Sequence, residues 1–260
     1  MILGSSHLLA TAIHVPLSQY VSFERVEMNS DTIVDVQDVS RVYRMGEIEV
    51  HALRGVSLQI QRGQAIGIMG PSGSGKTTLL NLIGALDRPT RGRVVIDDVD
   101  ITEMSDDALT TVRRNKISYV FQFFNLLPVL TAYENVELPL LIAGVVEDAR
   151  KEQVDHLLSL VGLTERAEHR PDELSGGEQQ RVAIARALAK PKGSASSIVV
   201  LADEPTGDLD YNTGKEILDI LVSLTKGEGG TLITVTHDPE VGEKMDYVYR
   251  MRDGQIENPK

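Results

Sequence analysis

The sequence predicts an α/β protein built on a buried, largely parallel β-sheet, and three observations lead to this fold class. Apolar segments alternate with turn signals along the chain, as successive β and α units do. Two segments, 199–202 and 232–235, are nearly continuous apolar runs, which is typical of strands buried on both faces of a parallel sheet. From about 122 to 181 the strand pattern disappears, which predicts a helical subdomain inserted into the sheet-containing core.

The individual elements follow from the same patterns. Strands are expected at residues 32–38, 55–60, 64–69, 93–97, 117–121, 197–202, 231–236 and 246–251. Helices are expected after Gly75 and near residues 105–114, 132–143, 147–161, 177–189, 212–225 and 239–244. Within the helical window we expect short breaks at Pro139, Gly162 and Pro171, because proline and glycine disfavour helix interiors. The Gly/Ser-rich segment 192–197 predicts a surface loop that bulges.

Size and composition limit the classes of protein. The chain has 260 residues, of which 42% are hydrophobic, and this suits one large α/β domain or two modest ones. No apolar run reaches the roughly 18–20 residues that a membrane-spanning helix needs. Any role at a membrane is therefore expected to come through a partner. Cysteine is absent, which excludes disulfides and cysteine-ligated metal sites.

The charge distribution argues against nucleic acid as a partner. The formal net charge is −12, and an acidic surface repels a phosphate backbone. Residues 1–30 differ from the rest, since no Lys or Arg precedes Arg25 and a secretory leader would begin with a basic segment. We interpret them as an extension, either loosely held or a mis-assigned start, before a domain at 31–256 whose helical subdomain covers about 122–181.

A phosphate-binding pattern lies at residues 70–77, which have the sequence Gly-Pro-Ser-Gly-Ser-Gly-Lys-Thr. It stands between an apolar strand and a helical segment, which is the context this motif requires. Its glycines let backbone N–H groups and a helix N-terminus face a polyphosphate. We expect Lys76 to neutralise the β- and γ-phosphates and Thr77 to ligate Mg²⁺. The pattern itself fixes Gly70, Gly75, Lys76 and Thr77, and the family resemblance described below extends the expected phosphate-binding residues to Ser72, Gly73, Ser74 and Thr78.

Two acids end the apolar strand at residues 198–202. After a phosphate-binding loop, an acid in the place of Asp203 holds Mg²⁺, and Glu204 would polarise the attacking water as the general base. Taken alone, the pair could equally be solvated acids at a strand end.

A second candidate anion site precedes the helix expected at 177–189. Ser175 and Glu178 have the spacing of a capping box, which by itself only starts a helix. The adjacent Gly176 and Gly177 also permit close backbone approach at this helix N-terminus. Two separate anion-binding surfaces suggest ATP clamped between them.

With these motifs the chain resembles an ATP-binding cassette (ABC) ATPase from about residue 32 to 255. The signature Leu-Ser-Gly-Gly-Glu at 174–178 is its specific part, since the phosphate loop occurs in many unrelated NTPases. The strings at 84–90, 124–128, 134–139 and 202–207 resemble the lipoprotein-release and macrolide-export subfamily, which has relatives in cell division and peptide export. The resemblance implies a P-loop core with a mixed sheet, an N-terminal antiparallel β subdomain and the inserted helical subdomain.

The resemblance also assigns roles to single residues. Tyr43 matches the aromatic that stacks on adenine, and Gln122 matches the glutamine that touches Mg²⁺ and the water. His237 matches the switch histidine near the γ-phosphate. The loop at 207–210, which ends on Asp210, matches the one that crosses the dimer interface, although Asp208 replaces the Asn or Ala often found there. Four residues are thus expected in catalysis: Glu204, His237, Gln122 and Lys76.

A further set of roles concerns the signature and the metal. Ser175, Gly177 and Glu178 match the signature that contacts the γ-phosphate of ATP held by the opposite subunit. The expected Mg²⁺ ligands are Thr77, Gln122 and Asp203.

These roles imply an ATPase that works as a head-to-tail homodimer and drives a transmembrane permease from the inner face of the membrane. Export is favoured by resemblance, with the residues after Gln122 as the docking surface. An alternative is a non-transport ATPase that controls cell-wall remodelling or cell division through a membrane partner. A third interpretation is a cassette that acts on DNA or ribosomes. Such a protein is expected to have tandem cassettes, long coiled coils or a basic face, and the sequence shows none of these features.

Overall fold

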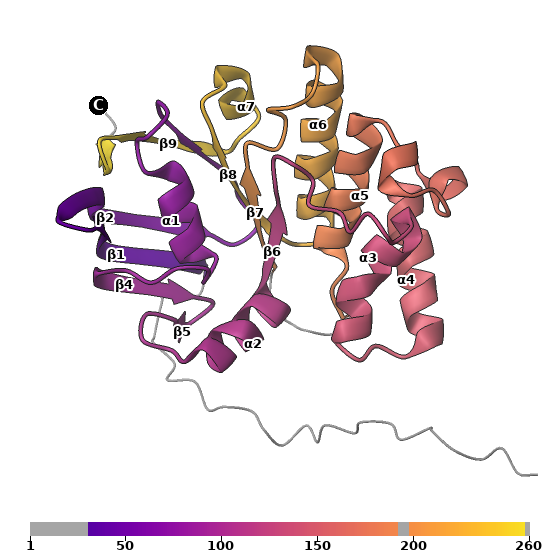
Figure 1. Cartoon of the computed structure of the whole chain (residues 1–260), viewed down its shortest axis with the longest axis horizontal. Coiled ribbons are helices and arrows are strands. Elements are labelled where there is room, and N and C mark those ends of the chain that lie inside the picture. Colours follow the sequence, from indigo (N-terminus) through magenta and orange to yellow (C-terminus); the bar gives the residue numbers. More distant parts are fainter. Residues whose placement is uncertain (1–30, 192–197, 258–260) are drawn as a thin grey trace, which may run out of the picture.

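The computed structural model describes residues 31–191 and 198–257, and these residues form two β-sheets with helices around them (Figure 1). The extension expected at 1–30 and the loop expected at 192–197 lie outside the described residues.

The central sheet has six strands in the order β10-β9-β3-β8-β7-β6. Its strands are β3 (Ala65–Met69), β6 (Ile117–Val120), β7 (Val199–Asp203), β8 (Thr231–Thr236), β9 (Tyr247–Arg252) and β10 (Gln255–Glu257). All neighbours pair in parallel except β10, which pairs antiparallel with β9. The predicted mixed α/β sheet is confirmed.

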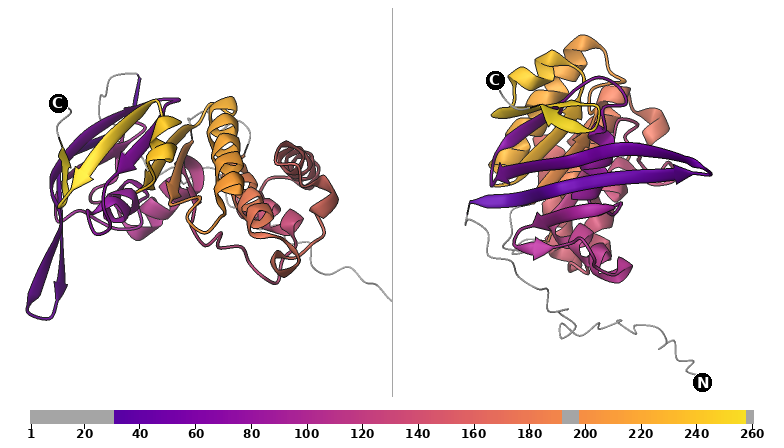
Figure 2. Two further views of the ribbon diagram at one scale, coloured as in Figure 1. Left: turned by 90° about the horizontal axis from the view of Figure 1, so that it is seen from above. Right: turned by 90° about the vertical axis from the view of Figure 1, so that its left-hand side faces the viewer.

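The second sheet is antiparallel and has the order β2-β1-β4-β5. It consists of β1 (Thr32–Met45), β2 (Ile48–Gln61), β4 (Arg91–Ile96) and β5 (Val99–Asp100). Figure 2 shows the β1–β2 hairpin extending past the rest of the molecule. The expected strands 32–38 and 55–60 were too short. The far end of the β1–β2 hairpin is largely exposed, and the pairing of the two strands shifts in register. The sequence there therefore lacks the alternation of apolar and polar residues that marks a half-buried strand.

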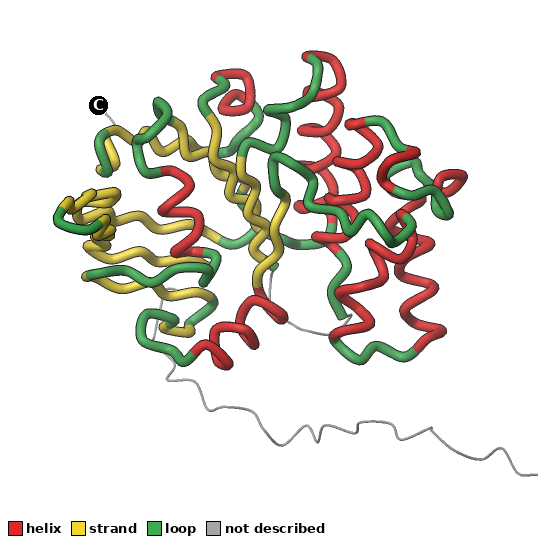
Figure 3. Tube along the Cα trace, viewed as in Figure 1, coloured by secondary structure: helices red, strands yellow, loops and turns green. Residues whose placement is uncertain are grey.

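The helices gather on the two sides of the central sheet (Figure 3). They are α1 (Lys76–Ile83), α2 (Asp106–Lys116), α3 (Ala132–Ile142), α4 (Glu147–Leu160), α5 (Gly176–Leu188), α6 (Tyr211–Gly227) and α7 (Pro239–Glu243), with short 3₁₀ turns at Thr164–Arg166 and Pro171–Glu173. Within 31–191 and 198–257, no helix combines the length and apolar character needed to cross a membrane.

The helical window is confirmed, since no described residue between β6 and β7 is in a strand. The break expected at Pro139 was wrong, because α3 continues through it. A proline inside a helix removes one N–H donor and its ring crowds the carbonyl of residue i−4, but the neighbours Val136 and Leu140 are completely buried. Packing of that face therefore outweighs the lost hydrogen bond.

Two hydrophobic clusters form the core, one on each face of the central sheet. Successive side chains of a strand point to opposite faces, so Val199 and Leu201 join the cluster with α1 and the antiparallel sheet. Val200 and Ala202 join the cluster with α3 to α6. The central sheet is thus packed on both faces, and loops leave it at the carboxyl ends of its parallel strands.

Candidate nucleotide-binding site

The candidate site lies at the carboxyl edge of the central sheet. Strands β3, β8, β7 and β6 are successive parallel neighbours, and their registers align Met69 with Thr236 and Val235 with Asp203. The segments that leave these strands therefore emerge side by side. Loops at the carboxyl ends of parallel strands are the usual place for ligands in α/β proteins.

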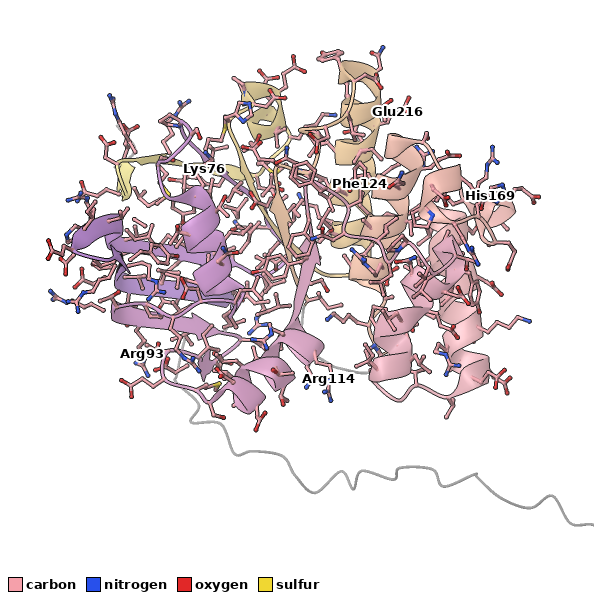
Figure 4. The ribbon with its side chains drawn as sticks, in the orientation of Figure 1. Lys76, Arg93, Arg114, Phe124, His169 and Glu216 are labelled. Carbon is pink, nitrogen blue, oxygen red and sulfur yellow. The ribbon has the colours of Figure 1, made fainter. Side chains whose placement is uncertain are left out.

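These loops enclose a cleft of about 760 Å³. Most of the predicted site residues line it: Ser72, Gly73, Gly75, Lys76, Thr77, Thr78, Gln122, Asp203, Glu204 and His237. Figure 4 shows Lys76, at the start of α1, and Phe124, in the segment after β6, at the same edge of the sheet. Four segments far apart in sequence are thus brought to one cleft.

The phosphate loop has the backbone that the glycines predict. Gly75 has φ of 101° and caps α1, and a Cβ there would lie 2.5 Å from the carbonyl oxygen of Ala52. Such a residue must be glycine on both counts. The Lys76 ammonium donates hydrogen bonds to the carbonyl oxygens of Gly70 (2.8 Å) and Pro71 (3.1 Å). The hydroxyl of Ser74 is buried and has no hydrogen-bond partner among the described residues.

Two of the three residues expected to hold a metal, Thr77 and Asp203, are in direct contact, and the third, Gln122, lines the same cleft. Thr77 Oγ1 donates to Asp203 Oδ1 over 3.3 Å. Burial raises the pKa of Asp203, the nearby charge of Glu204 adds to this, and the Thr77 hydrogen bond and Lys76 oppose it. A hydroxyl and a carboxylate are ligands that Mg²⁺ prefers. In the described part of the chain no cluster of three His, Cys, Asp or Glu could cage a metal by itself.

Glu204 is held at the carboxyl edge by β8 and the residue after it. Its carboxylate accepts a hydrogen bond from Thr236 Oγ1 (3.0 Å), and its other oxygen lies 2.9 Å from His237 Nδ1. Its backbone N–H donates to the Val235 carbonyl (3.0 Å). The predicted base and the predicted switch histidine therefore touch each other directly.

The signature residues lie elsewhere, at the N-terminus of α5. Ser175 and Glu178 form a complete capping box, in which the Glu178 carboxylate accepts from the Ser175 N–H and hydroxyl. These hydrogen bonds lower the pKa of Glu178. A Cβ on Gly177 would meet Thr213 Cγ2 at 2.6 Å, so close packing on α6 fixes this glycine. The structure does not bring this group to the cleft.

Four further predicted residues are not among those that line the cleft: Gly70 and Ser74 of the phosphate loop, Tyr43 and Asp210. Asp210 caps α6 by accepting from the Thr213 N–H (3.2 Å). The Tyr43 hydroxyl donates to Asp87 Oδ2 (2.7 Å), and the Arg41 guanidinium lies 4.5 Å from the ring centre.

Sequence reasoning missed one wall of the cleft. Val50, His51 and Ala52 of β2 line it beside the phosphate loop. No local motif marks them, because they reach the cleft only through the folding of the long hairpin over α1.

A glycine-rich loop between a strand and a helix, with acids at the end of a nearby parallel strand, defines a P-loop nucleotide-binding protein. Comparison with known proteins refines this class. The family described as ABC transporter matches residues 53–207. An uncharacterized ABC transporter ATP-binding protein of Thermotoga maritima is 51% identical over 86% of this chain and 94% of its own length. A macrolide export ATP-binding/permease protein MacB of Syntrophobacter fumaroxidans is 46% identical over 86% of this chain, which corresponds to 31% of that protein.

Comparison with solved structures leads to the same family. A dimeric structure of MJ0796, described as a bacterial ABC transporter cassette, has a TM-score of 0.77 and 45% identity, covering 87% of this chain and 97% of that one. A post-hydrolysis dimer of MJ0796 bound to ADP and Pi has a TM-score of 0.77 and 44% identity, covering 88% and 98%. The chain belongs to the ABC transporter family, as an ATP-binding ATPase cassette, and the predicted resemblance is confirmed.

Proposed function

We propose that this chain is the ATPase subunit of an ABC transporter and that two copies, arranged head to tail, bind ATP between them. Each composite site would take the phosphate loop from one copy and the signature segment of α5 from the other. The related cassette MJ0796 has been solved as a dimer, which supports this assembly.

One observation carries the proposal: a single chain has both halves of the site but keeps them apart. Helix α1, which follows the phosphate loop, packs in one hydrophobic cluster, whereas α5 packs in the cluster on the opposite face of the sheet. Figure 1 shows α1 and α5 on the two sides of the central strands. Ser175 is exposed and free to face a second copy. Such an interface is closed and symmetric, because each copy contributes its phosphate loop to one site and its signature segment to the other.

The residues of the cleft would then act in a defined way. Lys76 would exchange its loop carbonyls for the β- and γ-phosphates of ATP. Glu204, oriented by Thr236 and His237, would accept a proton from the attacking water. The exposed signature serine and the N-terminus of α5 would stabilise the γ-phosphate from the second copy. Loss of these contacts after hydrolysis would loosen the pair, which is a two-state switch.

We further propose Mg²⁺ as the cofactor, with Thr77, Asp203 and Gln122 as its protein ligands. The first two already share a hydrogen bond, and the lack of a three-carboxylate cage in the described chain suits an ion that keeps waters and binds substrate phosphates. When bound, Mg²⁺ would neutralise the charge that develops on the phosphates.

The segment after Gln122 is the proposed docking surface for a transmembrane permease. Phe123 is 72% exposed and Leu127 is 43% exposed, whereas Leu126 is partly buried and packs against the core. Exposed apolar groups next to a site mark an interaction surface. The relatives named MacB join an ATP-binding and a permease part, which favours an export system and a place on the inner face of the membrane.

Mixing two inactive variants tests the composite site. Lys76→Ala should disable the phosphate loop, and Ser175→Arg should disable the signature, so each alone should lose ATPase activity. In a mixed head-to-tail dimer one of the two sites is intact, and random pairing should restore roughly a quarter of wild-type turnover.

Ser159→Arg, on the exposed face of α4, is the matched control for an added arginine and should leave turnover unchanged. Wild-type turnover in Ser175→Arg alone would contradict the proposal, because the signature would then have no part in the site.

A further inference from the structure

The loop after Glu204 makes a contact with Gln122 that the proposed mechanism does not use. Gln122 Nε2 donates a hydrogen bond of 3.2 Å to Asp208 Oδ1. Gln122 lines the cleft, whereas Asp208 is exposed and is not among the residues that line it. Asp208 is also the position at which the sequence departs from the Asn or Ala expected there.

The loop that carries Asp208 is held in place from both ends. Gly207 N–H donates to the Glu204 carbonyl (3.0 Å) and Leu209 N–H donates to the Thr206 carbonyl (3.2 Å), so two turns follow each other. The completely buried Gln180 of α5 donates to the Pro205 carbonyl (2.5 Å). The Asp208 carboxylate is therefore presented to Gln122 by a fixed backbone.

A carboxylate can only accept hydrogen bonds, whereas a carboxamide has one donor end and one acceptor end. Asp208 consequently selects the orientation of the Gln122 amide in which Nε2 faces the loop. The opposite end, Oε1, receives no hydrogen bond from the described residues. We infer that Asp208 is a positioning residue, which turns the Gln122 carbonyl oxygen outward for the metal ion of the nucleotide.

This inference rests on the proposed role of Gln122 as a metal ligand. An Ala at position 208 would leave the amide free to rotate, and an Asn could also pair with the amide in the reversed orientation. The carboxylate removes both alternatives. Partners that orient metal ligands in this way typically change metal affinity by about 10–100-fold when they are lost.

The first test uses the protein without metal or nucleotide. The side-chain amide signals of Gln122 are observed by ¹H–¹⁵N NMR and assigned with Gln122→Ala. We expect one hydrogen-bonded amide proton in the wild type and its loss in Asp208→Ala. Asp155→Ala, which removes an exposed acid from α4, is the charge-matched control and should leave the signals unchanged. Gln122 signals that do not respond to Asp208→Ala would overturn the inference.

The second test is a double-mutant cycle on metal affinity. Mn²⁺ replaces Mg²⁺ so that its binding with ADP can be followed by electron paramagnetic resonance, at protein concentrations at which the chain is monomeric. Asp208→Ala should weaken Mn²⁺ binding by about 10-fold. In a Gln122→Ala background the same change should have no further effect. Additive effects would overturn the inference, because Asp208 would then act without Gln122.

The two tests separate the inference from the proposed function. If Gln122→Ala leaves Mn²⁺ affinity unchanged, the metal role of Gln122 is wrong, and the inference fails with it. If Gln122→Ala weakens binding but Asp208→Ala does not, the metal role stands and only the inference falls.

Discussion

At the scale of single residues, Glu204 is the side chain on which the proposed chemistry depends most. Its φ of 45° is unusual for a residue other than glycine, and such a conformation costs about 1–3 kcal/mol. The surrounding contacts offset this cost, since both carboxylate oxygens and the backbone N–H are engaged by residues 235–237. These contacts hold the carboxylate in the lining of the cleft.

Glu204→Gln should therefore lower ATP turnover without preventing nucleotide binding. The amide keeps the size of the side chain but cannot accept a proton, so we expect a loss of about 10²–10⁴-fold in turnover. Turnover is measured by phosphate release and binding by calorimetry. The exposed Glu228 at the end of α6 provides the control, and Glu228→Gln should keep wild-type turnover. A Glu204→Gln variant with unchanged turnover would exclude this residue as the base.

How far the sequence predicts a residue depends on whether its partners are local. The phosphate-loop pattern could be found in the sequence, because it is defined by a fixed spacing of glycines and a lysine within eight positions. The contact between Glu204 and His237 could not be predicted from the sequence, because it depends on the register in which β7 pairs with β8. Tyr43 remains a prediction, and its hydrogen bond to Asp87 comes from a loop far along the chain.

At the scale of elements, the segment between Gln122 and α3 is organised by one buried side chain. Asn135 is completely buried, and the two N–H groups of its amide are shared among three carbonyls that lie within hydrogen-bond distance, those of Leu127 (3.2 Å), Leu130 (3.2 Å) and Thr131 (2.9 Å). Its Oδ1 accepts from the Leu127 N–H (2.8 Å). This single residue thus closes the loop that carries the proposed docking surface.

Asn135→Ala should lower the free energy of unfolding by about 1–3 kcal/mol, because buried backbone groups would lose their partners. Urea unfolding followed by circular dichroism measures the change. Asn212→Ala, at an exposed position on α6, serves as the control and should change stability by less than about 0.5 kcal/mol. Equal stability of Asn135→Ala and the wild type would show that the loop does not depend on this residue.

Helices and strands could be predicted where burial of one face produces a regular spacing of apolar residues. They were missed where no such spacing exists. The buried parallel strands β7 and β8 agree with the predicted ranges within a few residues. The short strands β5 and β10 were missed, although Asp253-Gly254 with φ of 48° and 78° is a turn that favours a hairpin. A strand of two or three residues has too few side chains to display a period.

At the scale of the whole molecule, the chain places two half-sites on opposite sides of one sheet. The proposed phosphate-loop half and the proposed signature half lie apart in one chain, because the sheet and its two hydrophobic clusters separate α1 from α5. In the proposed assembly, a second copy would supply the missing half without any change in the fold. The sequence could predict both halves from motifs, but only the packing of α1 and α5 shows that they are kept apart.

The most direct test of this account is the mass of the Glu204→Gln variant in solution, measured by light scattering after size exclusion. With saturating Mg-ATP, which this variant should bind but not hydrolyse, we expect a particle of twice the mass of one chain, and without nucleotide a single chain. A particle that stays at the mass of one chain under saturating Mg-ATP would contradict the shared site.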